Sequence, residues 1–260
     1  MRKLLLLLAV PSVMMLTACS SHYQLTDVSR TRILVDKTYD AAPDAAAAAF
    51  LAPYKEAVDS VMGPVVGEVA RDMAAERPES TLSNLLPDIF MHMAQHYNEK
   101  PDFAVYNMGG IRAALSKGKV TYGDVLDVAP FENKICFLTL SGDKVLELFS
   151  QIALRGGEGV SKGVQLVITK DGQLLSARVN GKEIDPQASY RITTIDYLAQ
   201  GNDGMPAFKS GTDLNSPKDD KNNARYVITD YFREMMKAGK AVDAKVEGRI
   251  IIRRRVKGER

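Results

Sequence analysis

The sequence predicts a single layered α+β domain, in which helices cover a mixed or antiparallel sheet. Strand-like and helix-like segments follow one another without the strict alternation that is typical of parallel α/β folds. Two turn signals, Asp171-Gly172 and Asn180-Gly181, predict β-hairpins within residues 164–185. Residues 82–97 carry apolar side chains at helical spacing. With 45% hydrophobic and 25% charged residues, the composition is that of a globular protein.

The first half of the chain is divided by prolines and glycines. Residues 31–36 (TRILVD) and 64–73 (PVVGEVARDM) are interpreted as strands because they are rich in β-branched residues. Pro43-Asp44 opens a helical stretch that Pro53 is expected to interrupt or restart. Ser80, Thr81 or Ser83 is expected to cap the helix of residues 82–97, and residues 102–107 form a strand that runs into two glycines.

The second half adds strands and two amphipathic helices. We expect Ser141 to cap the first of these helices. The predicted strands are 134–142, 189–196 and 247–253, and the predicted helices are 143–154 and 224–237.

The N-terminus has the pattern of a bacterial export signal. Arg2 and Lys3 precede an apolar stretch from Leu4 to Leu16, which is too short to span a bilayer comfortably. The following LTAC resembles a bacterial lipobox, so we expect lipidation of Cys19. The alternative is a plain signal peptide with an incidental cysteine. The lipobox interpretation predicts a lipid-anchored protein of the bacterial cell envelope that faces either the periplasm or the outside.

This interpretation divides the chain into four parts. They are a lipoprotein signal peptide (1–18), a tether (19–30), the domain (31–252) and a basic tail (253–260). Removing residues 1–18 leaves 32 basic and 32 acidic residues, so no overall field favours nucleic acid. The tail is interpreted as a solvated C-terminus, with contact to a membrane or partner as the alternative. Cys136 lies in an apolar run and is expected to be inert packing.

Several residues in predicted loops suit a nucleoside or nucleotide. Gly109 and Gly110 would let the backbone approach a ligand closely, and Arg112 offers a fork of donors to a phosphate. Two aromatic rings on separate loops could hold a base between them, while amide and carboxylate groups suit the base edge and the ribose. These residues are Phe131, Tyr197, Asn107 and Asp203. Each also has an ordinary structural interpretation as a turn, core or surface residue.

Four stretches together resemble the C-terminal domain of bacterial and animal 5′-nucleotidases, and the resemblance covers about residues 50–252. They are RPESTLSNLLPD (77–88), NMGGIR (107–112), DVAPFENKI (127–135) and YLAQGNDG (197–204).

The resemblance implies a role for each site residue. The base would stack between Phe131 and Tyr197, with Asn107 near the base. Arg112 and Arg77 would bind phosphate, and Asp203 would bind ribose.

The sequence departs from the family pattern at four positions. Met108 stands where the family has glycine, and so do Ser83 and Asn202, while Tyr197 replaces the commoner phenylalanine. Met108 and Asn202 are expected to narrow the pocket or to shift its base preference.

The complete enzymes of this family also carry a metallophosphatase domain, in which two metal ions activate water. None of the histidines, His22, His92 and His96, lies in a motif of that domain. His92 and His96 share a helix at a spacing that suits zinc, but packing is the favoured interpretation. We therefore expect no catalytic residue, metal or other cofactor in this chain.

Three functions remain open after this reasoning. The first is the nucleotide-binding half of a split 5′-nucleotidase, in which a separate metallophosphatase chain supplies a divalent metal pair. The second is a nucleoside or nucleotide receptor without chemistry, anchored in the envelope. The third is a scaffold that has lost the pocket, which the retained site residues argue against.

Overall fold

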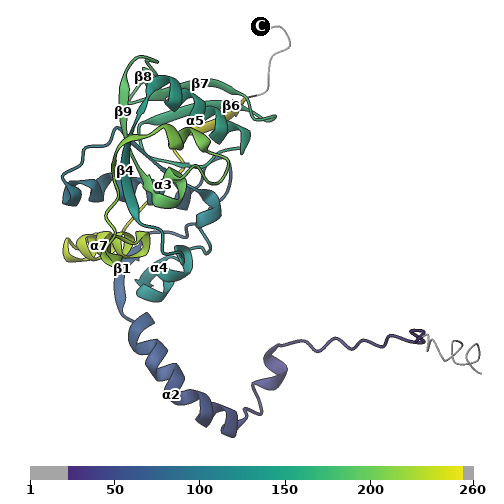
Figure 1. Cartoon of the computed structure of the whole chain (residues 1–260). Coiled ribbons are helices and arrows are strands. Elements are labelled where there is room, and N and C mark those ends of the chain that lie inside the picture. Colours follow the sequence, from purple (N-terminus) through teal and green to yellow (C-terminus); the bar gives the residue numbers. More distant parts are fainter. Residues whose placement is uncertain (1–22, 254–260) are drawn as a thin grey trace, which may run out of the picture. The chain divides into compact units, whose positions relative to one another are not determined.

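The computed structural model describes residues 23–253, so Cys19 and the predicted signal peptide lie outside the described residues, as do residues 254–260. The chain divides into two compact units, one ending at Phe50 and the other beginning at Leu51. This boundary lies within helix α2 (Ala45–Met62), which is labelled in Figure 1. No helix among the described residues is long and apolar enough to cross a membrane.

The segment before α2 is extended and carries one short helix, η1 (Lys37–Tyr39). The strand predicted at 31–36 is wrong, because these residues pair with no other described strand and leave Ile33 and Val35 exposed. The helix predicted after Asp44 is confirmed, since the Asp44 carboxylate accepts hydrogen bonds from the amides of Ala46 and Ala47. The interruption predicted at Pro53 is wrong, because α2 runs from Ala45 through Pro53 to Met62; proline's φ of about −65° is helical, although its missing N–H removes one hydrogen bond.

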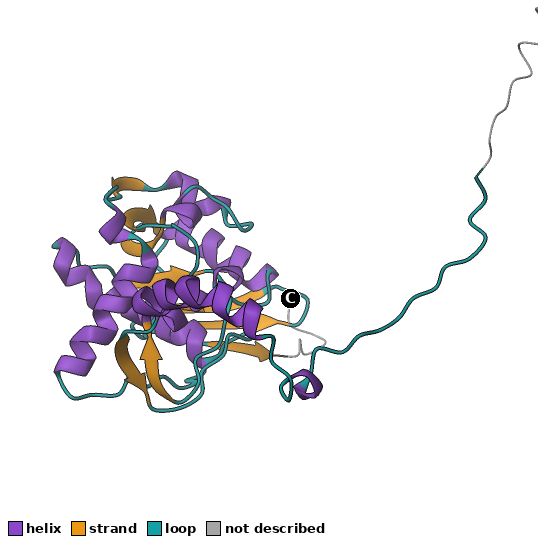
Figure 2. Ribbon diagram, turned by 90° about the horizontal axis from the view of Figure 1, so that it is seen from below, coloured by secondary structure: helices purple, strands orange, loops and turns teal. Residues whose placement is uncertain are grey.

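The second unit contains mixed helices and strands, which confirms the α+β class. In Figure 2 helices pack against the strands, some of which stay uncovered at the edge of the unit. Its helices are α3 (Thr81–Met93), η2 (Ala94–Tyr97), η3 (Met108–Gly110), α4 (Tyr122–Val128), α5 (Gly142–Leu154), α6 (Asp196–Ala199), η4 (Pro206–Ser210), η5 (Asp220–Asn222) and α7 (Ala224–Lys237). Its strands are β1 (Val65–Val69), β2 (Phe103–Tyr106), β3 (Gly118–Thr121), β4 (Ile135–Ser141), β5 (Gly159–Val160), β6 (Val164–Thr169), β7 (Leu174–Val179), β8 (Lys182–Glu183), β9 (Ser189–Ile195), β10 (Thr212–Asn215) and β11 (Ile250–Arg253).

The strands form three sheets. The central one has the order β10-β4-β9-β2-β5, in which β2 and β9 run parallel and β4 pairs antiparallel with β9. A second sheet has the order β11-β6-β7-β8, and it contains the predicted hairpin of β6 and β7. The third pairs β1 with β3. The sheet is therefore mixed, as the sequence predicted.

Helices bury both faces of the central sheet, since all four residues of β2 are buried and successive side chains of a strand point to opposite faces. Helix α3 packs against β2 and β5, and Phe90 meets Tyr106 edge to face at a centroid distance of 5.6 Å. Helix α5 packs on the same sheet through Phe149, whose ring lies 5.2 Å from that of Phe103. Ser80 caps α3, since its hydroxyl accepts the Ser83 amide and the Ser83 hydroxyl accepts the Ser80 amide. The predicted cap of this helix is thereby confirmed.

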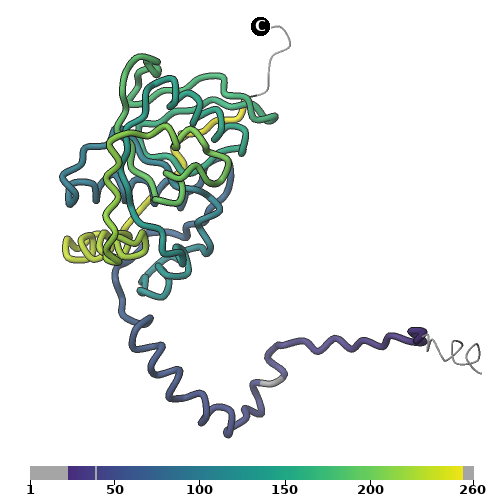
Figure 3. The backbone as a smooth tube through the Cα atoms, in the orientation of Figure 1, coloured from purple at the N-terminus to yellow at the C-terminus, as the bar shows by residue number. Residues whose placement is uncertain are grey.

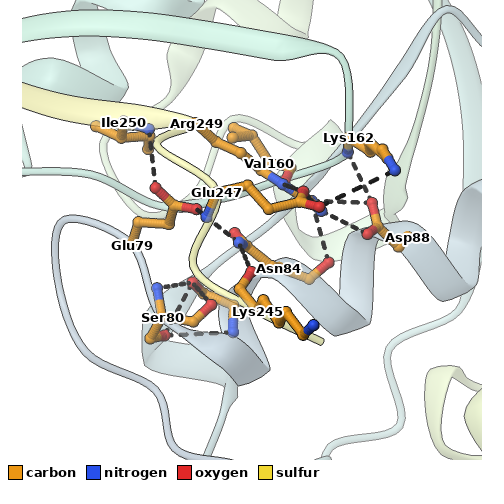
Figure 4. Close-up of polar contacts among 11 residues, drawn as sticks. Glu79, Ser80, Asn84, Asp88, Val160, Lys162, Lys245, Glu247, Arg249 and Ile250 are labelled. Atoms are coloured by element: carbon orange, nitrogen blue, oxygen red, sulfur yellow. Dashed lines mark hydrogen bonds and ion pairs between the residues drawn. The ribbon is translucent and has the colours of Figure 1, made fainter. Parts of the chain in front are cut away.

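The C-terminal strand is tied to α3 by a buried arginine. In Figure 3 the last segment, drawn in yellow, returns through the unit before β11 pairs with β6. Arg249, which is 4% exposed, donates to both carboxylate oxygens of Asp88 and to the carboxylate of Glu247. It also donates to the carbonyl oxygens of Asn84 and Val160, as Figure 4 shows. We call these five residues the Arg249 cluster.

The elements that were not predicted from the sequence include β3, α4 and β10. Helix α4 begins at a capping box in which Thr121 and Asp124 exchange hydrogen bonds, so a local signal for it was present. Strand β10 is short and largely exposed, and it pairs with the edge of β4 at only two positions. Its pairing therefore depends on tertiary contacts.

Candidate ligand-binding site

Three strand ends bring the predicted site residues together. Parallel β2 and β9 end at the same edge of the central sheet, and antiparallel β4 begins there. The segments that follow β2, precede β4 and follow β9 therefore meet at this edge. They line a cavity of about 210 Å³ formed by Asn107, Gly109, Phe131, Asn133, Tyr197 and Asp203.

The two aromatic rings are held on adjacent, hydrogen-bonded segments. The Lys134 amide donates to the Asp196 carboxylate at 3.0 Å, and the Asp196 amide donates back to the Lys134 carbonyl at 2.8 Å. Both rings reach the cavity and stay accessible, with Phe131 47% and Tyr197 36% exposed. Phe131 is therefore not a core residue, and two accessible rings in one cavity suit a flat ligand.

The Phe131 loop is also fixed from α7. Arg225 at the start of this helix donates to the Pro130 carbonyl at 3.1 Å and to Glu132 at 3.0 Å. The Ala224 amide donates to the Asn133 carbonyl at 2.7 Å. These contacts fix the backbone on both sides of Phe131, so its exposed ring projects from a rigid loop.

Gly109 and Gly110, in the turn after β2, have different structural roles. A Cβ on Gly110 would lie 2.6 Å from Asn107 Oδ1, so any other residue there would displace the Asn107 side chain. Gly109 is exposed and lines the cavity, and a Cβ there would meet Asp203 Oδ2 at an ordinary 3.6 Å. Close approach to a ligand thus concerns Gly109, while Gly110 shapes the turn. Met108 is buried in the core and does not line the cavity.

Asp203 is the polar centre of the cavity. Its carboxylate accepts from Asn107 Nδ2 at 2.6 Å and from the Tyr197 hydroxyl at 3.0 Å. The hydrogen bond to Asp203 raises the pKa of the Tyr197 phenol, which therefore stays protonated at neutral pH. The buried Asn107 Oδ1 has no hydrogen-bond partner among the described residues. The structure thus brings Asn107, Tyr197 and Asp203 into one hydrogen-bonded group.

The two predicted phosphate ligands lie outside the residues that line the cavity. Arg112 is exposed, and its side chain makes one long hydrogen bond of 3.3 Å to the Gly109 carbonyl. Arg77 donates to the Gly157 carbonyl at 2.9 Å and to Glu158 at 2.5 Å. Phosphate binding by Arg112 and Arg77 remains a prediction.

Glu158 and Arg155 were not predicted from the sequence. The Glu158 side chain is fully buried, and it accepts from Arg155 Nε and from the Met108 amide, each at 2.5 Å. Partial burial opposes the charge of Arg155, but its hydrogen bond to Glu158 raises the pKa of the guanidinium overall. Arg155 Nη2 lies 3.9 Å from Asp203 Oδ2. A chain of charges therefore runs from Arg77 through Glu158 and Arg155 to Asp203.

Asn133 lines the cavity and was also missed by the sequence analysis. Its signal was its place two residues after Phe131, in a loop already expected to meet the ligand. Glu158 and Arg155 gave no comparable signal, because they follow a helix that the sequence linked to no site.

The histidine pair on α3 and η2 contacts one carboxylate of α7. Nε2 of His92 lies 3.0 Å from Glu234, and Nε2 of His96 lies 2.8 Å from it. Within residues 23–253 no three His, Cys, Asp or Glu side chains are placed to hold a metal ion. Cys136 is buried, and burial raises its pKa to about 12, as expected for an unreactive thiol.

Comparisons with known proteins agree on one family. A sequence model described as 5′-nucleotidase, C-terminal domain matches residues 62–210. A 5′-nucleotidase of Vibrio cholerae is 28% identical over 167 residues, covering 63% of this chain and 30% of that protein. Protein UshA of Yersinia enterocolitica is 32% identical over 178 residues, covering 65% of this chain and 31% of that protein. The chain thus spans about a third of the length of these relatives.

A solved structure shows the same fold. The 5′-nucleotidase precursor of Thermus thermophilus superposes with a TM-score of 0.69 at 27% identity, covering 82% of this chain and 44% of that one. The sheet and helices that position the cavity are therefore similar to those of a 5′-nucleotidase.

Proposed function

Because the chain belongs to the 5′-nucleotidase C-terminal domain family, we propose that it binds a nucleoside or nucleoside 5′-phosphate in the cavity between Phe131 and Tyr197. The observation that carries this proposal is the pair of accessible rings over a carboxylate, held on three adjoining segments. A cavity of about 210 Å³ lies below the roughly 300–1,000 Å³ of a typical small-molecule site. It would hold the base and part of the ribose and leave the phosphate outside.

Each group of site residues is assigned to one part of the ligand. The rings of Phe131 and Tyr197 stack on the base, and Asp203 accepts hydrogen bonds from ribose hydroxyls. Asn107 lies beside Asp203 and meets the base or its neighbourhood. Arg112 stands exposed beyond the glycine turn, where its donors can meet a phosphate. The resemblance gives Arg77 the same role.

Hydrolysis would come from another polypeptide. The chain spans about a third of the length of relatives that are named 5′-nucleotidases. We propose that a separate metallophosphatase chain supplies a divalent metal pair and attacks the phosphate while this domain holds the nucleoside. Lipid anchoring at Cys19 would raise the effective concentration of the two partners on one bacterial membrane.

The alternative is a lipid-anchored envelope protein that binds nucleosides or nucleotides without chemistry. It has the same cavity and differs in having no partner. The two are separated by measuring phosphate release from AMP by this chain alone and with a metallophosphatase-domain protein and Mn²⁺. Phosphate release that occurs only when both proteins are present supports the split enzyme. Phosphate release by this chain without the partner contradicts both proposals.

Two measurements test the binding and the anchor. Calorimetry with adenosine and AMP should show saturable binding, and no binding at about millimolar ligand would favour a scaffold that has lost the pocket. A Cys19→Ala variant should leave the membrane fraction or stay unprocessed. If it partitions with membranes as the parent does, the lipobox interpretation is wrong.

A further inference from the structure

One buried carboxylate joins the segments around the site. The Glu158 side chain is 0% exposed, and both of its oxygens are used. Oε1 accepts from Arg77 Nη2 and Arg155 Nε, and Oε2 accepts from the Met108 amide in the glycine turn. The buried carboxylate therefore has three hydrogen-bond donors, and two of them are positively charged guanidinium groups.

The backbone packs tightly around this carboxylate. Gly157 has φ +111°, and a Cβ there would lie 2.4 Å from the Pro78 carbonyl oxygen. Arg77 Nε donates to the Gly157 carbonyl at 2.9 Å, and Arg155 Nη1 would lie 3.6 Å from a Cβ on Gly204. Glu158 therefore lies where the segment of Arg77, the glycine turn at Met108 and its own segment with Arg155 meet.

The three arginines near the cavity differ in how their charge is matched. Arg77 and Arg155 share the Glu158 carboxylate, and Arg155 also lies 3.9 Å from Asp203. Arg112 has no carboxylate partner among the described residues, and its side chain donates one hydrogen bond there, to the Gly109 carbonyl. Since an anion binds most strongly to an unmatched cation, Arg112 is the strongest phosphate site of the three.

We propose that Glu158 is a specificity-determining residue of this site, because it neutralises Arg77 and Arg155 and leaves Arg112 as the arginine that meets a phosphate. The inference rests on the proposed function, and it replaces the phosphate role of Arg77 with a positioning role. One unmatched arginine can pair with one phosphate group. Second and third phosphates on the ligand should therefore add little affinity.

Calorimetry with adenosine, AMP and ADP on the full chain tests the inference. For the parent protein, ADP should bind no more than about threefold more tightly than AMP. Glu158→Gln should raise the preference for ADP over adenosine about tenfold, because it frees two guanidinium groups. Glu183→Gln is the matched control, since this side chain is 79% exposed on β8, where it pairs with Arg178 away from the cavity, and its charge is screened. It should change the preference less than about twofold.

Arg77→Met tests the inference even if Glu158→Gln does not fold. In the Arg77→Met variant the buried Glu158 carboxylate keeps Arg155 as a hydrogen-bond partner. We expect adenosine and AMP to change by the same factor in this variant. A loss of AMP affinity of about tenfold with adenosine unchanged would overturn the inference, and so would a parent protein that gains about tenfold from the second phosphate. If the parent binds neither adenosine nor AMP, the proposed function fails as well. If the parent binds adenosine but gives either of the two contradicting results, the inference about Glu158 fails and the proposed function stands.

Discussion

The Arg249 cluster and the binding site both contain arginines, but the arginines differ in how many of their donors are already used. Arg249 is buried, and its Nε, Nη1 and Nη2 atoms all donate to carboxylates or carbonyls. Arg112 is exposed and makes one long hydrogen bond to its own turn. Between these extremes, Arg77 and Arg155 are about one-third exposed and share one carboxylate. An arginine with all its donors used holds the fold, and one with donors to spare is available for a ligand.

The largest effect is expected from breaking the Arg249 cluster. Arg249→Met removes a buried cation, and we expect a loss of about 3 kcal/mol in the free energy of unfolding. This is at the low end for buried ion pairs because Asp88 and Glu247 remain 32% and 39% exposed. Urea unfolding measures the loss. The adenosine affinity of the folded variant should stay within about twofold of the parent, and a loss below about 1 kcal/mol would contradict the assignment.

Phe131→Ala should weaken ligand binding and leave the free energy of unfolding almost unchanged. Base stacking on an aromatic side chain contributes about 1–3 kcal/mol, so the Kd values of adenosine and AMP should rise together by about 5- to 150-fold. The unfolding free energy should stay within about 0.5 kcal/mol, because the ring is 47% exposed. Leu175→Ala is the control, at 46% exposure on β7, and should leave both affinities unchanged. Equal losses in the two variants would exclude stacking on Phe131.

Arg112→Ala separates the phosphate from the nucleoside. A hydrogen bond to a charged group contributes about 1.5–3 kcal/mol, so calorimetry should show AMP weakened about tenfold or more. Adenosine should change less than about twofold, because it brings no charge. Arg71→Ala removes another exposed arginine, paired with Asp243, and should change neither affinity. The phosphate assignment fails if Arg112→Ala weakens both ligands equally.

The smallest effect is expected at Tyr197. Tyr197→Phe keeps the ring and removes the hydroxyl that donates to Asp203, so adenosine should weaken less than in Phe131→Ala. This hydrogen bond raises the pKa of Tyr197 above the usual value of about 10. Its contribution is therefore fully present below about pH 10 and is lost as pH rises through the higher folded-state pKa. Adenosine affinity measured from about pH 6 to about pH 9 should be flat, and a fall over that range in the parent alone would contradict this.

Local patterns were enough for most elements and for the first set of site residues. The apolar spacing of Leu82, Leu86 and Phe90 predicted α3, and the glycine signals at 171–172 and 180–181 predicted the hairpin region. Asn107 at a strand end and Phe131, Tyr197 and Asp203 in predicted loops were selected for their chemistry, and they line one cavity. Local patterns failed at residues 31–36, where a strand-like sequence has no partner.

The sequence by itself determined which residues carry suitable chemistry and which segments begin and end regular structure, because both depend on neighbours along the chain. Only the tertiary structure decided which of three arginines has an unmatched charge. Glu158 reaches Arg77 across a separation of 81 residues and the Met108 amide across 50. Such contacts follow from how β2 and α3 pack in three dimensions, and a carboxylate that is buried there neutralises cations that look free in the sequence.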